Sequence, residues 1–92
     1  MIRDEVRLYI EATERVHTLR DKRLLWPRPY DEREALRLAH IAGVNTPEEY
    51  KTFRQQIAHD LKVAEEALWA LRLPKGLTPD EAQAVSTAMR LK

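Results

Sequence analysis

The chain has 92 residues, of which 43% are hydrophobic and 34% charged, and its sixteen Lys and Arg nearly balance its fifteen Asp and Glu, leaving a net charge of +1. Such a length suits one domain, and the near-neutral charge argues against binding polyelectrolytes through bulk charge. The absence of cysteine excludes disulfides, thiolate metal ligands and thiol nucleophiles. No apolar run approaches the roughly twenty residues of a spanning helix, and no signal-peptide pattern opens the sequence. We therefore expect a cytoplasmic protein with a single helical domain over residues 1–92.

Helix starts are marked by two segments that share one capping pattern. Residues 46–49 (Thr-Pro-Glu-Glu) and 78–81 (Thr-Pro-Asp-Glu) each place Thr at the N-cap, Pro at the first helical position and Glu at the third. This pattern is typical of a capping box, in which the Thr hydroxyl and the Glu carboxylate each accept a hydrogen bond from a backbone N–H. Asp31 with Glu34 forms a weaker version. We expect a helix to begin at each of these points.

Glycine and proline mark the helix ends. Gly43 suits the left-handed position after one helix, and residues 74–76 (Pro-Lys-Gly) interrupt another. No segment alternates apolar and polar residues in the manner of a strand. The sequence therefore predicts an all-α fold, a small bundle dominated by two long antiparallel helices. The four expected helices span about residues 2–25, 32–42, 47–73 and 79–91.

Apolar residues recur at helical spacing along both long segments, as expected for buried faces. In the third helix the apolar face comprises Tyr50, Phe53, Ile57, Leu61, Ala64, Leu68 and Leu71. In the first helix it comprises Ile2, Val6, Tyr9, Thr13 and Val16, and the same line continues as Arg20 and Arg23. The apolar face of the first helix therefore becomes basic before the helix ends.

The lengths of the two long helices predict self-association. A helix over residues 47–73 would be about 40 Å long, whereas a compact chain of this size has a radius of gyration of about 12 Å. The two short helices cannot cover both long ones, so we expect a dimer or higher homo-oligomer with an interface at Leu61, Leu68 and Trp69. Two alternatives stay open. One is that the chain is an elongated monomer whose third helix is kinked or frayed. The other is that the last helix covers Trp69, so that this residue belongs to the core and not to an interface.

The stretch from Arg20 to Tyr30, which covers the end of the first helix and most of the connector after it (residues 26–31), combines cations with aromatic rings. The candidate residues for binding a protein partner or a nucleic acid are Arg20, Lys22, Arg23, Trp26, Arg28 and Tyr30. Trp, Tyr and Arg are enriched in protein-binding hot spots, and cations combined with aromatic rings also bind single-stranded nucleic acid. A third interpretation is structural, because cations suit a helix C-terminus and Trp26 could close the end of the bundle.

Residues 36–46 (Leu-Arg-Leu-Ala-His-Ile-Ala-Gly-Val-Asn-Thr) resemble the first helix and turn of a helix-turn-helix. Ala39, four residues before Gly43, has the small side chain that lets two such helices cross closely. The pattern is degenerate, because the inward positions of the second helix fall on Glu49 and Thr52. The acidic start of that helix would also repel phosphates. The resemblance implies DNA binding as an alternative to an ordinary helical corner.

Patterns for catalysis and metal binding are sparse. No hydroxyl residue lies in a nucleophile motif, and both glycines are accounted for as helix stops. Glu14 and His17 have the spacing of a di-iron ligand pair, but neither His40 nor His59 follows a glutamate at that spacing. We therefore expect no catalytic residues, no metal and no cofactor. The few Asn and many charged residues resemble a thermophilic composition.

Together these patterns favour a non-catalytic, small helical interaction module that self-associates and binds a larger protein partner or assembly. The alternative is a small nucleic-acid-binding protein that uses the basic and aromatic connector or the degenerate helix-turn-helix. Neither hypothesis involves a membrane.

Overall fold

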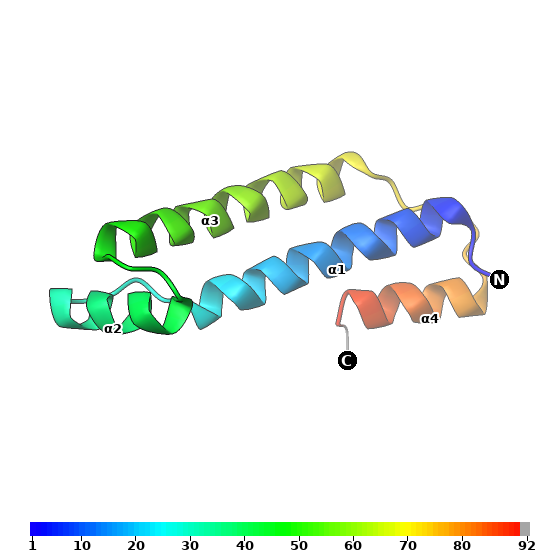
Figure 1. Cartoon of the computed structure of the whole chain (residues 1–92). Coiled ribbons are helices and arrows are strands. Elements are labelled where there is room, and N and C mark those ends of the chain that lie inside the picture. The colour runs from blue at the N-terminus through cyan, green and yellow to red at the C-terminus, as the bar shows by residue number, and fades with distance from the viewer. Residues whose placement is uncertain (91–92) are drawn as a thin grey trace. The chain divides into compact units, whose positions relative to one another are not determined.

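The fold is all-α, as the sequence predicts. A computed structural model describes residues 1–90 and places four helices in this range, with no strand among them: α1 (Asp4–Leu25), α2 (Glu32–Ala42), α3 (Pro47–Ala70) and α4 (Pro79–Ala88). The chain forms two compact units, which we call unit 1 (Met1–Thr18 and Lys62–Lys92) and unit 2 (Leu19–Leu61). In each unit a part of α1 lies beside a part of α3 that runs in the opposite direction (Figure 1). The expectation of one domain stays a prediction.

Capping side chains begin the helices where the sequence predicts them. The Asp31 carboxylate accepts a hydrogen bond from the Glu34 N–H at 2.7 Å at the start of α2. Thr78 and Glu81 form a complete capping box at the start of α4. At α3 the box is altered. The Thr46 hydroxyl accepts from the Glu49 N–H at 3.1 Å, but the Glu49 carboxylate accepts from the N–H of Asn45, one residue before the predicted donor.

Three helix ends differ from the predicted ranges. The first helix begins at Asp4: the Arg3 carbonyl accepts the first helical hydrogen bond, from the Arg7 N–H, while the Arg3 N–H, which has no partner within the helix, donates to the Glu81 carboxylate at 3.0 Å. The third ends at Ala70, since the Leu71 N–H bonds to the Leu68 carbonyl and so tightens the last turn. The fourth ends at Ala88, before Arg90, which has a left-handed φ of 58°. Its predicted last residue, Leu91, lies outside the described residues. Gly43 ends α2 with a φ of 80°, as expected.

Each unit buries a small apolar core. In unit 1 the buried residues include Val6, Val16, Ala64, Val85 and Ala88, and in unit 2 they include Ala35, Leu38, Ala39, Tyr50, Ile57 and Leu61. The predicted apolar faces are therefore confirmed in their central positions. Their outer members, Ile2 and Leu71, are each 38% exposed because both lie outside the helices.

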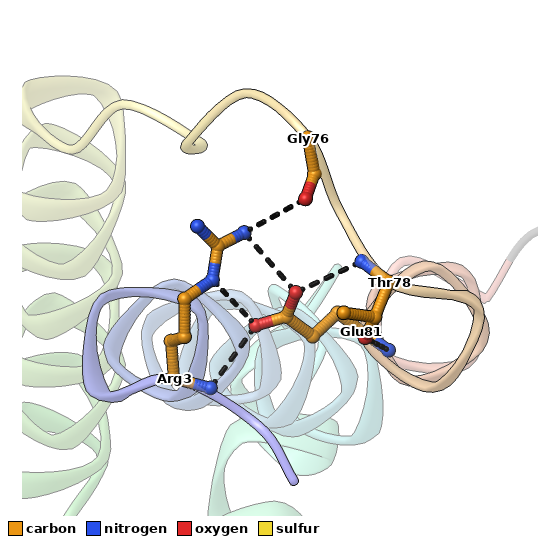
Figure 2. A network of polar contacts seen from close by, with 4 residues as sticks. All are labelled: Arg3, Gly76, Thr78 and Glu81. Atoms are coloured by element: carbon orange, nitrogen blue, oxygen red, sulfur yellow. Dashed lines mark hydrogen bonds and ion pairs between the residues drawn. The ribbon is translucent and has the colours of Figure 1, made fainter.

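A buried carboxylate joins three segments of unit 1 (Figure 2). The side chain of Glu81 is 0% exposed and accepts hydrogen bonds from the Arg3 N–H, the Arg3 guanidinium and the Thr78 N–H. The guanidinium of Arg3 also donates to the Gly76 carbonyl at 3.2 Å. Hydrogen bonds from Arg3 and from the backbone of Thr78 and Arg3 lower the pKa of Glu81 from 4.5 to about 2. The carboxylate is therefore ionised at neutral pH and fastens the chain's first residues to the start of α4.

None of the helices among residues 1–90 is long and apolar enough to cross a lipid bilayer.

Candidate functional site

The start of α3 holds the connector that follows α1 in place. Tyr50 and Arg54 are one helical turn apart, so both side chains lie on the same face of α3. The Tyr50 hydroxyl donates to the Pro27 carbonyl at 2.7 Å, and the Arg54 Nε–H donates to the Trp26 carbonyl at 3.0 Å. Two consecutive carbonyls of the connector therefore have side-chain donors from α3. These bonds fix the backbone from which the predicted binding residues project.

Three aromatic rings form the apolar centre of this region. The ring of Trp26 meets the rings of Tyr50 and Phe53 edge to face, with centroids 6.4 Å and 5.4 Å apart. Tyr50 is only 1% exposed and packs with Leu38 and Ala39 of α2. Edge-to-face pairs stabilise by about 0.5–1.5 kcal/mol beyond their area burial. The indole of Trp26 is therefore held by the cluster rather than projecting into solvent.

A pocket of about 660 Å³ opens beside this cluster, entirely within unit 2. Its walls come from the end of α1, the connector, α2 and the first turns of α3. The lining residues are Arg23, Trp26, Arg28, Pro29, Ala35, Pro47, Glu48, Tyr50, Lys51, Arg54, Gln55, Ile57 and Ala58. A pocket of this size lies within the range of small-ligand and peptide anchor sites.

The charges that line the pocket are strongly unbalanced. Four cationic side chains, those of Arg23, Arg28, Lys51 and Arg54, face it with the single carboxylate of Glu48. The whole chain carries a net charge of only +1, so positive charge is concentrated here. A ligand that carries negative charge is attracted towards these cations, whereas a cationic ligand would be repelled. The pocket thus combines an apolar floor with a cationic rim.

The two tyrosines of unit 2 differ in their surroundings. Burial raises the pKa of the Tyr50 phenol. Tyr30 is 84% exposed, and a hydrogen bond with Glu34 raises the pKa of its phenol. Both phenols therefore stay protonated at neutral pH and act as hydrogen-bond donors rather than as anions.

Half of the predicted binding residues line the pocket, namely Arg23, Trp26 and Arg28. The other half lie elsewhere. The Lys22 ammonium lies 5.8 Å from the centroid of the Phe53 ring, and neither Arg20 nor Tyr30 belongs to the pocket wall. Whether any of the six binds a partner stays a prediction.

Sequence reasoning missed the contribution of α3 to this site. The apolar pattern predicts Tyr50 in the core, which is confirmed, but the pattern does not show that its hydroxyl also holds the connector. Lys51 and Arg54 have the i, i+3 spacing of one helix face. This pair of cations beside the apolar face was a usable signal, but nothing in the linear sequence shows which connector lies against it.

The residues predicted for the oligomer interface differ in exposure. Leu61 is buried and Leu68 is half-buried, whereas Trp69 is 70% exposed. The described part of α4 therefore leaves most of the Trp69 indole accessible. On the surface of this single chain, Trp69 is the member of the predicted interface that a second molecule could reach.

The weaker sequence signals occupy separate places. Glu14 and His17 line a second pocket of about 320 Å³ together with Thr87 and Arg90. Among residues 1–90, no three His, Asp or Glu side chains come together in a way that could hold a metal ion. In the segment that resembles a helix-turn-helix, Ala39 is buried, which fits both a helix-turn-helix and an ordinary helical corner.

Comparison of the chain with protein-family models, with curated proteins and with solved structures found no match.

Proposed function

We propose that this protein is a non-catalytic interaction module that binds an acidic segment of a partner protein in the pocket of unit 2. The observation that carries the proposal is the pocket's lining, in which four cations and one carboxylate surround aromatic and aliphatic side chains. An acidic peptide with one large apolar residue fits both features, because its carboxylates meet the cations while the apolar residue enters the pocket. Such an anchor in a pocket is the usual source of affinity in peptide recognition.

The geometry of the aromatic cluster favours a protein over a nucleic acid. Single-strand binders stack bases on accessible ring faces, whereas Trp26 is half-buried and packed against Tyr50 and Phe53. Glu48 and Glu49 are exposed at the start of α3, where they would repel a phosphate backbone. Nucleic-acid binding is therefore the less favoured alternative, and a binding experiment has to exclude it.

Self-association is the second part of the proposal. An exposed Trp on a charged helix is a common feature of protein interfaces, because its large apolar area gains most from being covered. With 70% of its surface exposed, Trp69 is the centre of the proposed contact between copies. Unit 2 then binds the partner while the end of α3 in unit 1 joins two molecules.

The test is fluorescence anisotropy with a short labelled peptide in which glutamates flank a phenylalanine. We expect it to bind, and the same peptide with glutamine in place of glutamate to bind more weakly. The variant carrying Arg28→Gln and Lys51→Gln should lose about 2- to 30-fold in affinity, since each exposed ion pair contributes about 0.2–1 kcal/mol. Arg33→Gln, which removes an exposed cation of α2 outside the pocket, is the matched control.

Two results would contradict the proposal. One is equal binding of the glutamate and glutamine peptides, which would mean that the cationic rim does not recognise acidic ligands. The other is tighter binding of a single-stranded oligonucleotide than of the acidic peptide, with a steep loss of affinity as salt is raised. The second result would establish the nucleic-acid alternative.

A further inference from the structure

The exposed surface around Trp69 has a charge pattern that suits a second copy of the same surface. Glu66 lies three residues before Trp69 and Arg72 lies three residues after it, and all three side chains are exposed. The last turn of α3 closes with the bond from the Leu71 N–H to the Leu68 carbonyl, and the helix ends at Ala70, so Arg72 lies two residues beyond the helix end. A carboxylate and a guanidinium therefore flank the indole at equal separations in sequence.

In a two-fold contact, each surface meets an identical copy of itself in the reverse direction. If the axis passes through Trp69, the residue three positions before it lies opposite the residue three positions after it on the other copy. Glu66 then lies opposite the partner's Arg72, and Arg72 lies opposite the partner's Glu66. The two indoles meet at the centre, where an apolar contact is best shielded from water.

A competing register is less favourable. An axis between Glu65 and Glu66 would bring Lys62 opposite Trp69, but it would also place the Glu65 carboxylate opposite the partner's Glu66. Like charges placed opposite each other weaken an interface and are a common means of excluding a wrong register. Of these two registers, charge complementarity favours the one centred on Trp69.

We propose that two copies of this chain dock through the end of α3 across a two-fold axis at Trp69, with Glu66 of each copy paired to Arg72 of the other. This inference rests on the proposed self-association, and it adds the occupant, the register and the pairing. Because each ion pair occurs twice, reversing one charge changes two contacts at once.

The experiment is analytical ultracentrifugation over a range of concentrations. We expect the wild type to dimerise and Trp69→Glu to be monomeric. Glu66→Arg alone and Arg72→Glu alone should each weaken the dimer by about 10- to 100-fold, because two attractive pairs become repulsive. The double variant, Glu66→Arg with Arg72→Glu, should dimerise again, and so should an equimolar mixture of the two single variants, since opposite charges then face each other at both pairs.

Matched controls separate interface effects from misfolding. Glu11→Arg reverses an exposed charge on α1 in unit 1 and should leave dimerisation unchanged. Circular dichroism should show the same helix content in every variant. A wild type that stays monomeric at every concentration overturns both the proposed self-association and this inference. A stable dimer whose single variants are unaffected, or whose double variant and mixture fail to recover, overturns the register and the pairing alone.

Discussion

Replacing Tyr50 with phenylalanine removes a single oxygen atom from the contact between α3 and the connector. The hydroxyl donates to the Pro27 carbonyl at 2.7 Å, and the ring is 1% exposed. Phenylalanine keeps the ring contacts with Trp26 and Phe53, so the change isolates the hydrogen bond. Net loss of one such bond costs about 0.5–1.5 kcal/mol. The bond is part-buried rather than fully buried, and we expect a loss of about 1 kcal/mol.

Thermal unfolding followed by circular dichroism measures this loss. For a domain of this size, about 1 kcal/mol corresponds to a fall in Tm of roughly 4–8 °C. Affinity for the acidic peptide should fall as well, because the Tyr50 hydroxyl no longer holds the Pro27 carbonyl, which lies between Trp26 and Arg28. Tyr9→Phe is the matched control, since Tyr9 is a half-buried tyrosine on α1, in unit 1 and outside the connector contact. Its stability should change by less than about 0.5 kcal/mol.

Two outcomes would refute the reasoning about Tyr50. An unchanged Tm for Tyr50→Phe would show that the hydroxyl does not stabilise the connector. A loss above about 3 kcal/mol would exceed the range of one hydrogen bond and indicate that the ring itself had moved.

Three further predictions concern stability. The pKa of Glu81 is about 2 in the folded chain instead of 4.5, so in acid the unfolded chain binds a proton that the folded chain does not. The ionised Glu81 carboxylate therefore stabilises the fold above about pH 4.5, and this stabilisation is lost as the pH falls through about 2. Glu81→Gln should therefore lower the Tm near pH 6 and have a smaller effect near pH 2, and an equal effect at both values would contradict this linkage. Gly43→Ala should lower the free energy of unfolding in urea by about 1–2 kcal/mol. Gly43 has a φ of 80° and no atom within 4 Å of an added Cβ, so the cost comes from the backbone conformation and not from a clash. Unchanged stability would show that the turn relaxes. Ile57→Ala should cost about 2–5 kcal/mol in the same assay, since Ile57 is buried, and a cost below about 1 kcal/mol would mean that the site collapses around the smaller side chain.

Helix boundaries were predictable wherever the deciding atoms lie within one turn of each other. The Asp31 carboxylate and the Glu34 N–H are three residues apart, and so are Thr78 and the Glu81 N–H. Such bonds form as soon as the backbone turns, whatever packs outside the helix. At α3 the prediction is wrong in one bond, because the Glu49 carboxylate accepts from the N–H of Asn45 and not from the N–H of Thr46.

The candidate site was predictable only on its connector side. Composition pointed to Arg23, Trp26 and Arg28, and all three line the pocket. The α3 side of the pocket includes Tyr50 and Arg54, whose side chains donate to carbonyls more than twenty positions earlier in the chain. No spacing rule relates residues so far apart, since their distance is set by how the helices pack.

The sequence by itself determined the helical class, the capping residues and the central apolar faces, because each depends on local backbone geometry and on the periodicity of the helix. Tertiary structure decided the rest. Glu81 was predicted as a local cap, and only the folded chain shows that the same carboxylate is buried and binds Arg3, 78 positions away in sequence. Likewise, only folding collects the four cations at one pocket and leaves Trp69 exposed. The physical reason is that burial and long-range pairing depend on which faces meet, and local sequence does not specify that.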